Sequence, residues 1–257
     1  MAQAGGSADR NDMLYGLHAV REALKAGARP LQRLLVLRTD RQFGDLVHAA
    51  KAKGIPVHVE PPAAFDRLVP HGKHQGVIAF VAAKSYGTTQ DILERARQRG
   101  EPPFVIILDG VEDPHNLGAI LRTAEAAGVH GVFIPERRAV GLTSVVAKVS
   151  AGAIDHVAVS QVGNVTSLIA DLKERGFWIY GVEPSSANRY TAIDMTGPLA
   201  LVLGGEGKGI RPGVLKACDG LISIPMMGKV ASLNVSAAVA VVLYEGVRQR
   251  VEKKSIN

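Results

Sequence analysis

Short apolar runs alternate with helical patterns over the C-terminal part of the chain, from Phe104 to about Val251. The run "FVIILDG" at its start is typical of a strand buried on both faces of a sheet. Strands that alternate with helices predict a parallel sheet with helices on both faces. Ligands of such sheets bind beyond the carboxyl ends of the strands, so the loops that follow strands are the candidate sites. Further expected strands are "GVFIP", "HVAVS", "FWIYGV", "LALVLG" and "LISIP".

The residues before this part predict a second, smaller module. Residues 13–83 follow an α-β-α-β-α-β pattern, which is typical of a compact α/β domain. Residues 84–103 hold one charged helix between glycine and Pro-Pro, and we interpret them as an interdomain linker. Residues 1–12 lack an apolar run and predict a disordered tail. The larger α/β domain then comprises residues 104–257.

Composition narrows the function classes. With 47% hydrophobic and 21% charged residues, the chain is expected to be globular. Its net charge of +6 favours a polyanionic partner such as nucleic acid. The single cysteine, Cys218, excludes an internal disulfide and a multi-thiolate zinc site, and it fits a reducing cytoplasm. No run of about 18 apolar residues occurs, so no membrane helix is expected.

The first loop of interest, in "LDGVEDPHNLGAILRTAEAAG", leads from a strand into a helix. Asn116 is a residue type that caps the start of helices. Arg122 follows in the second turn among apolar neighbours, where a buried guanidinium would need an anionic partner. A structural salt bridge and a phosphate clamp are both compatible with this arginine.

The second loop, in "LVLGGEGKGI", is rich in glycine, which lets a backbone approach a ligand closely. It differs from a Walker A loop because Gly209 stands where Ser or Thr should follow Lys208. Its glycine spacing also fails the Rossmann pattern, and Glu206 would repel a pyrophosphate. The loop therefore predicts a ligand that is not a polyphosphate.

The third loop, "IPMMGKVASLNVSAA", leads from a strand into a helix rich in Ala and Val. Ser232 and Asn234 are both good cap residues, although capping needs only one of them. Ser236 is placed in the first helical turn without a further role. The small residues behind it suit a core or a subunit contact.

In order and spacing, these loops resemble the three sequence motifs of the SpoU/TrmH (SPOUT) family of RNA ribose 2'-O-methyltransferases. "YGLHAVREAL" and "HQGVIAFV" are similar to the ribosomal-protein-like domain that precedes the catalytic domain in the ribosomal-RNA branch of the family. The resemblance extends from about Leu14 to Arg250. It is greatest to the branch that methylates a guanosine ribose in the peptidyl-transferase region of 23S rRNA.

The resemblance implies an rRNA guanosine 2'-O-methyltransferase that uses S-adenosyl-L-methionine and no metal. It implies a small N-terminal α/β RNA-binding domain, and a C-terminal SPOUT α/β domain with a parallel sheet and a deep trefoil knot. It further implies a homodimer through the catalytic domain, with the active site shared across the interface. Carried over by position, the cofactor-binding residues are Gly204, Ile224 and Leu233, and the catalytic residues are Asn116, Arg122, Glu206, Ser232 and Asn234.

The implied reaction is a displacement in which a ribose 2'-hydroxyl attacks a methyl group on a sulfonium. The family assigns activation of the hydroxyl to the arginine at position 122, but a guanidinium with a pKa above about 12 is a poor base. We therefore expect Arg122 to clamp an RNA phosphate, which takes the proton, and to stabilise the developing alkoxide. Asn116, Ser232 and Asn234 would orient ribose and cofactor, one of the last two would also cap the helix, and Glu206 would pair with Arg122 or hold the substrate.

RNA capture is expected from basic residues of the first module. The candidates are Arg33, Arg38, Arg41, Lys73 and His74. His71 and His74 of "HGKH" lack a third ligand, so a metal site is not predicted there. His115 is expected to line the first loop.

Three alternatives stay open at this point. A nucleotide-dependent enzyme could use "GGEGKG" as a phosphate loop, although Glu206 and the missing Ser or Thr argue against it. A non-catalytic RNA-binding or ribosome-assembly protein would not need the complete catalytic set. The same chemistry could also act on another rRNA or tRNA nucleotide, as in antibiotic-resistance methyltransferases.

Overall fold

The computed structural model describes residues 13–27, 30–40, 42–70, 72–82 and 84–256. The predicted tail at residues 1–12 therefore lies outside the described residues. The chain divides into two compact units, of which the first comprises Met1–Ser85 and Leu142–His156. The second comprises Tyr86–Gly141 and Val157–Asn257. No helix among the described residues is long and apolar enough to cross a membrane.

The first unit is built on a mixed four-stranded sheet in the order β1-β4-β2-β3. Strand β4 is antiparallel to β1 and β2, whereas β3 is parallel to β2. Strand β1, which the sequence pattern missed, has only three residues, too few to display a period of two. The elements are β1 (Met13–Tyr15), α1 (Leu17–Ala26), β2 (Leu31–Val36), α2 (Gly44–Ala52), β3 (Val57–Val59), α3 (Pro62–Leu68), β4 (Val77–Val81) and α6 (Ser144–Val149).

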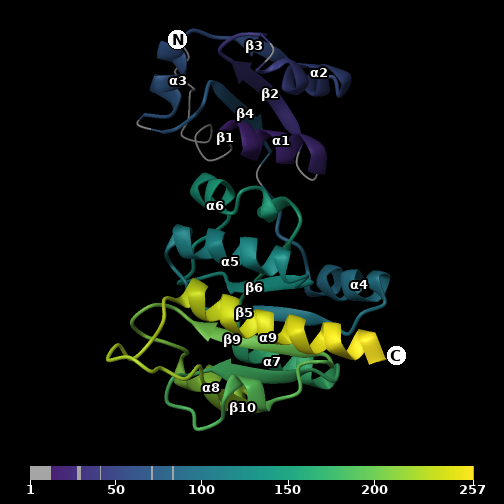
Figure 1. Cartoon of the computed structure of the whole chain (residues 1–257), viewed down its shortest axis with the longest axis vertical. Helices are drawn as coiled ribbons and strands as arrows, with labels where there is room; N and C mark the ends of the chain where they lie inside the picture. Colours follow the sequence, from purple (N-terminus) through teal and green to yellow (C-terminus); the bar gives the residue numbers. More distant parts are fainter. Residues whose placement is uncertain (1–12, 28–29, 41, 71, 83, 257) are drawn as a thin grey trace. The chain divides into compact units, whose positions relative to one another are not determined.

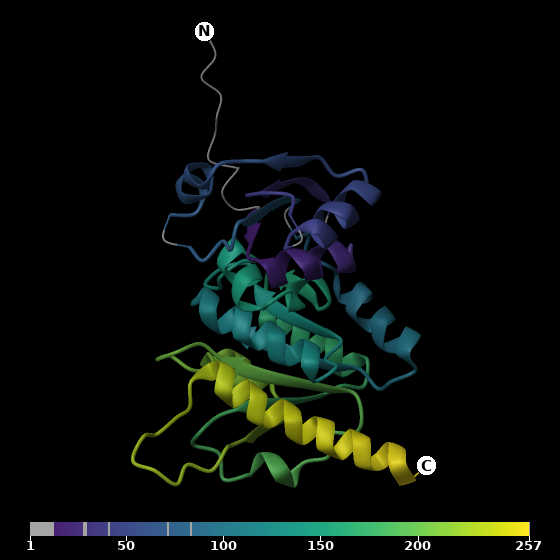
Figure 2. The same ribbon diagram turned by 45° about the horizontal axis from the view of Figure 1, so that its top comes forward.

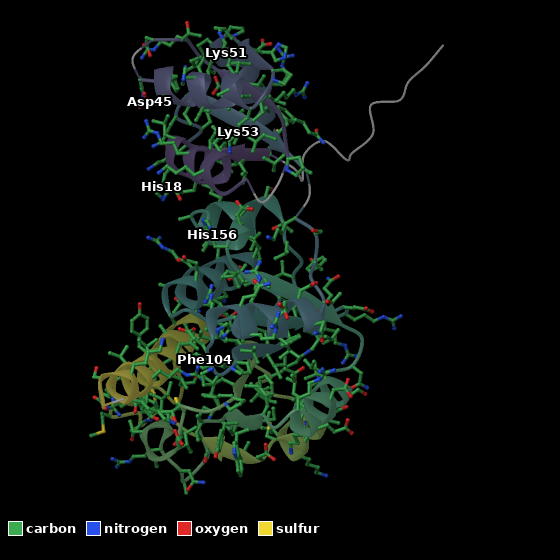
Figure 3. All side chains as sticks on the ribbon, turned by 90° about the vertical axis from the view of Figure 1, so that its right-hand side faces the viewer. His18, Asp45, Lys51, Lys53, Phe104 and His156 are labelled. Carbon is green, nitrogen blue, oxygen red and sulfur yellow. The ribbon has the colours of Figure 1, made fainter. Side chains whose placement is uncertain are left out.

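Apolar side chains from the sheet and α3 form the core of the first unit. Phe65 and Ile78 are fully buried there, beside Phe80 and Val69. Lys53, labelled in Figure 3, donates a hydrogen bond to the carbonyl of Leu24 near the end of α1. This contact joins α2 to an orphan carbonyl of α1 and so stabilises a helix end.

The second unit is built on the predicted parallel sheet, with six strands in the order β10-β8-β9-β5-β6-β7. Every neighbouring pair in it is parallel. The elements are α4 (Thr89–Arg99), β5 (Phe104–Asp109), α5 (Pro114–Ala126), β6 (Gly131–Pro135), β7 (Ala158–Val162), α7 (Val165–Glu174), β8 (Trp178–Val182), β9 (Leu199–Gly204), α8 (Pro212–Ala217), β10 (Gly220–Ile222) and α9 (Val235–Ile256). The predicted α/β class is confirmed for both units, while the trefoil knot stays a prediction.

Helices cover both faces of this sheet, which explains why β5 is apolar from Phe104 to Leu108. Val105 and Ile107 pack with α4, α7 and α8 in one core cluster. On the other face, α5 and α9 lie side by side, as Figures 1 and 2 show. Phe104, labelled in Figure 3, lies beneath α9, and the guanidinium of Arg250 stands 4.5 Å from its ring centre.

Helix α4 belongs to the second unit, although residues 84–103 were expected to form a linker. Its Ile92 is fully buried in the core cluster of the sheet. A capping box at Thr88 fixes the start of the helix, and Gly87 forms a parallel bridge with Ser160 of β7. Most residues of α4 are charged or polar, so its narrow apolar face was not evident from the sequence.

Gly131 tests this packing of α4 against β6. A methyl group at Gly131 would lie 2.4 Å from the Cγ1 atom of Ile92. We expect Gly131→Ala to lower the free energy of unfolding by about 1–3 kcal/mol, because the buried side chain must shift. Chemical denaturation followed by circular dichroism and by the fluorescence of Trp178 measures this.

The matched control is Gly213→Ala in α8, where no atom lies within 4 Å of the added methyl group. This variant should keep or slightly raise the stability, since alanine favours a helix. Equal stability of both variants would contradict the packing of α4 into the core.

Candidate functional site

Three loops meet at the carboxyl edge of the parallel sheet, as the sequence predicted. They follow β5, β9 and β10, and the third of them leads into α9. Strands β5 and β9 are direct neighbours in the sheet, with Asp109 paired to Gly204 at their ends. The first two loops therefore start side by side.

The glycines of the second loop permit contacts between backbones. A Cβ atom on Gly205 would lie 1.8 Å from the carbonyl oxygen of Gly110 in the first loop. A Cβ atom on Gly204 would lie 2.0 Å from the carbonyl carbon of Gly209. Only glycine fits at both positions, so the loop folds tightly upon itself and against the loop after β5.

Asn234 caps α9. Its Oδ1 atom accepts hydrogen bonds from the backbone N–H of Ser236 at 2.9 Å and from the Ser236 hydroxyl at 2.6 Å. Among the described residues, Ser232 makes no hydrogen bond and is exposed. Of the two candidate cap residues, Asn234 and not Ser232 therefore caps the helix. Ser236, which had no predicted role, donates both hydrogen bonds to the cap.

The amide nitrogen of Asn234 points to the other two loops. It donates to Asn116 Oδ1 and to Glu206 Oε1, both at 3.0 Å. The Nδ2 atom of Asn116 also donates to Glu206 Oε1. A network of three side chains thus joins the three loops, with Asn116 only 6% exposed at its base.

The position of Asn116 corrects its expected role as the cap of α5. The helix starts at Pro114, and the cap is Asp113, whose carboxylate accepts from the backbone N–H of His115 at 2.9 Å. Asp113 also accepts from the Asn116 side chain at 3.3 Å. An acidic residue followed by proline is a known start signal for a helix, and it would have identified Asp113.

A pocket of about 580 Å³ opens beside this network. Its volume lies in the range of about 300–1,000 Å³ that small ligands use. Its lining combines apolar side chains with backbone groups of the glycine loop, which suits an adenosine-like ligand and offers no cluster of cations for a polyphosphate. The predicted residues that line it are Gly204, Glu206, Ile224, Ser232, Leu233 and Asn234.

Arg122 is the one predicted site residue that lies apart from the network and the pocket. It follows Asn116 by six residues, about 240° around the helix at 3.6 residues per turn, so it projects from a different face of α5. Its side chain is exposed, and it makes no ion pair within the part of the chain that the structure describes. Within one copy Glu206 accepts from Asn116 and Asn234 and is not paired with Arg122, and its alternative expected role of holding the substrate stays a prediction.

Comparisons with known proteins show to which family a chain with these three loops belongs. Residues 103–244 match the SpoU rRNA Methylase family. The chain belongs to this family. Residues 13–87 match a second family, described as RNA 2'-O ribose methyltransferase substrate binding. Both matches agree with the predicted activity, and this SpoU-family chain is an RNA 2'-O-methyltransferase.

Relatives of known sequence align over nearly the whole chain. A Bacillus subtilis protein, assigned as a TrmH family tRNA/rRNA methyltransferase (YacO), is 44% identical over 94% of this chain and 97% of its own. The 23S rRNA (guanosine-2'-O-)-methyltransferase RlmB of Shewanella oneidensis is 42% identical over 94% of this chain and 98% of its own.

Two solved structures share the fold. The SpoU methyltransferase AviRb from Streptomyces viridochromogenes, in complex with AdoMet, has a TM-score of 0.81 at 23% identity, covering 96% of this chain and 94% of that chain. An AdoMet-bound rRNA methyltransferase from Sinorhizobium meliloti has a TM-score of 0.78 at 24% identity, covering 93% of this chain and 87% of that chain.

The other predicted residues divide into structural and exposed ones. His74 has a structural role, since its Nδ1 atom accepts from the Gly76 N–H at 3.0 Å and its ring stacks on Phe65. Arg38 pairs with Asp40 at 2.6 Å, and Arg33 covers the ring of Phe80. Lys73 and His115 are exposed. Arg41 and His71 lie outside the described residues.

Cys218 behaves as a small, partly buried apolar residue. Burial raises the pKa of its thiol to about 11, and the thiol donates to the Val214 carbonyl at 3.3 Å. A thiol with so high a pKa is rarely a thiolate at neutral pH, so it is no nucleophile. Among the described residues, no cluster of three His, Cys, Asp or Glu side chains is placed to hold a metal ion.

Two substitutions separate the cap from the network at Asn234. Asn234→Ser keeps a side-chain oxygen that caps α9 but removes the amide donor, so its loss in the free energy of unfolding reports the network alone and should be smaller than that of Asn234→Ala. Asn234→Ala removes both functions and should lose about 1 kcal/mol. Thermal and chemical denaturation measure the difference, and an equal loss in both variants would mean that the network, not the cap, stabilises the helix.

Proposed function

We propose that this chain transfers a methyl group from S-adenosyl-L-methionine to the 2'-hydroxyl of a guanosine ribose in 23S rRNA, as a homodimer. One observation carries the site assignment: Glu206 and Asn234, which Asn116 joins in one network, line the pocket that the glycine loop and the third loop enclose. Family membership supports the reaction, and the AdoMet complexes of two proteins with this fold support the cofactor.

The pocket beside the network is the proposed cofactor site. Gly204 lies at the end of β9, and Ile224 and Leu233 lie at the two ends of the third loop. Apolar side chains and free backbone groups suit an adenine ring better than charged residues would. When bound there, the cofactor supplies an electrophilic methyl group on a sulfonium.

The target ribose is placed against Glu206. Two amides hold this carboxylate in a fixed position, so it can accept a hydrogen bond from the ribose without a loss of its own order. Ser232 lines the same pocket and has a free hydroxyl, which suits a contact to ribose or cofactor. The 2'-oxygen forms its new bond to carbon as the carbon–sulfur bond breaks.

Arg122 from a second copy of the chain is proposed to complete the site. Within one copy the arginine lies on a different face of α5 from Asn116, and it is exposed without a partner among the described residues. A dimer that packs this face of α5 against the pocket of the partner would bring the guanidinium to the RNA. There it would hold a phosphate, which accepts the hydroxyl proton, and stabilise the developing alkoxide.

Identity of 42% to a 23S rRNA guanosine-2'-O-methyltransferase over nearly full length favours this target. The relative at 44% identity is assigned to tRNA or rRNA, so a tRNA nucleotide or another rRNA nucleotide is the second candidate. Mapping 2'-O-methylation across rRNA and tRNA, in cells with and without the gene, tests the target. Loss of a tRNA mark alone would move the target to tRNA, and no change in any RNA would overturn the proposed function.

Arg122→Ala tests the clamp. We expect turnover to fall at least about 100-fold, as for the loss of one transition-state donor. The dissociation constant for S-adenosyl-L-methionine should stay the same, because Arg122 does not line the pocket. Methyl transfer to RNA and calorimetric titration of the cofactor measure the two effects, with Arg175→Ala as a control on an exposed arginine at the opposite edge of the sheet.

Mixing Arg122→Ala with Asn234→Ser tests the shared site, because Asn234→Ser is also expected to lose turnover when it removes the amide donor to Glu206. Arg122→Ala and Asn234→Ser damage different parts of the site, so a mixed dimer contains one intact combination if the site is shared. Random exchange of subunits should then restore about a quarter of wild-type activity. A mixture as inactive as its components would place Arg122 and the pocket of one site in the same copy.

A further inference from the structure

A second pocket of about 450 Å³ lies on the other side of the glycine loop from the proposed cofactor pocket. Glu206, Lys208 and Gly209 line both pockets. The second pocket also reaches the loops after β5 and β6, including Glu112 and Arg138. We call it the cationic pocket, defined by Arg137, Arg138, Lys208 and Arg211.

The cations of the cationic pocket differ in their partners. Arg211 forms an ion pair with the buried Asp109 at 2.6 Å. In contrast, Arg137, Arg138 and Lys208 are exposed, and none of the three makes a hydrogen bond or ion pair with other described residues. Three free cations therefore converge on one cavity.

The acidic side chains of the pocket are mostly engaged. Asp113 accepts from the His115 backbone and from Asn116. Glu206 accepts from Asn116 and Asn234, and Asp109 is neutralised by Arg211. Only Glu112 is without such a partner among the described residues. The formal charges of the four carboxylates and four cations of the lining balance, but Arg137, Arg138 and Lys208 have no anionic partner among the described residues and can bind an anion without first breaking an ion pair.

The backbone of Arg138 supports a role for its side chain. Its φ angle is 61°, in the left-handed region where glycine is the favoured residue. The loop that holds it is fixed at both ends, since the Glu136 N–H donates to the Val162 carbonyl and the Val140 N–H donates to the Val111 carbonyl, both at 3.0 Å. A chain that keeps arginine where glycine would be relaxed retains a side chain at a cost to the backbone, and such outliers gather at functional sites.

We infer that the cationic pocket binds the phosphodiester backbone of the RNA next to the ribose that is methylated. Arginine and lysine bind phosphate by charge-assisted hydrogen bonds, and arginine can do so with two bonds at once. A phosphate in this pocket is separated from the proposed cofactor only by the Glu206–Gly209 stretch of the glycine loop. The pocket would thus hold the RNA backbone in place on one side of the ribose that is methylated. This inference rests on the proposed methyl transfer to RNA.

The test uses the full-length protein and Arg138→Gly. Glycine fits the left-handed backbone, so this variant removes the side chain without disturbing the loop. Total rRNA from cells that lack the gene is the probe, and binding is measured as a function of salt concentration. We expect binding to weaken about tenfold at low salt, and the slope of log K against log salt to fall by about 0.7–0.9, the value of one phosphate contact.

Lys208→Ala and Arg137→Ala should each lower the slope in the same way, whereas Arg175→Ala should keep the wild-type slope. Arg175 is an exposed arginine after α7, at the amino edge of the sheet, and it has no side-chain partner among the described residues. An unchanged slope in Arg138→Gly, or an equal decrease in Arg175→Ala, would overturn the inference. The affinity for S-adenosyl-L-methionine is measured in parallel and should not change in Arg138→Gly.

Failure of the proposed function gives a different result. If wild-type protein transfers no methyl group to any RNA, the methyl-transfer reaction is wrong, while the salt slopes still report which cations touch phosphate. If wild-type protein is active and Arg138→Gly binds and methylates RNA normally, only the phosphate site is wrong. The two outcomes are therefore separate.

Discussion

The carboxylate of Glu206 is the point on which the site depends. It accepts hydrogen bonds from Asn116 and Asn234, which belong to the loops after β5 and β10. The close contact of Gly205 with Gly110 brings the glycine loop near enough for these bonds to form. A larger residue at Gly205 would separate the loops and remove the hydrogen bond from the buried amide of Asn116 to Glu206, and losing a hydrogen bond at a buried group is costly inside a protein. The polar network can therefore form only if the two loop backbones pack closely at Gly205 and Gly110.

Asn234 explains why the third loop carries more cap residues than a helix needs. Its oxygen caps α9, while its nitrogen belongs to the wall of the pocket. A serine or aspartate could serve as the cap but could not donate to both neighbours, because only an amide offers an acceptor and two donors together. The position of α9 and the shape of the pocket therefore depend on the same side chain.

The sequence was sufficient for the strands of the parallel sheet and for the three loops, because each buried strand is a continuous apolar run bounded by polar residues. It did not predict strand order, since order depends on pairings between distant segments. The burial and contacts of individual side chains were also not predicted. Arg122 looked buried because its neighbours Ile120 and Leu121 are, yet it lies on the exposed side of α5. Asn116 looked like a cap because the Asp113–Pro114 signal was overlooked. Helix α4 resembled a linker in the sequence because only two of its described residues, Ile92 and Ala96, are buried, among many charged ones.

The charges around the site follow one rule that connects it with RNA. The carboxylates of Asp109, Asp113 and Glu206 accept hydrogen bonds from other groups of the protein, whereas Arg137, Arg138 and Lys208 make no ion pair with any described residue. A protein that binds a polyanion benefits from this asymmetry, because free cations meet phosphate without first breaking an internal ion pair. Arg122 follows the same rule on the far side of α5. The absence of an ion pair at Arg122 among the described residues is what the proposed contact with RNA and a second copy would need, because an internal salt bridge would compete with a phosphate for the guanidinium.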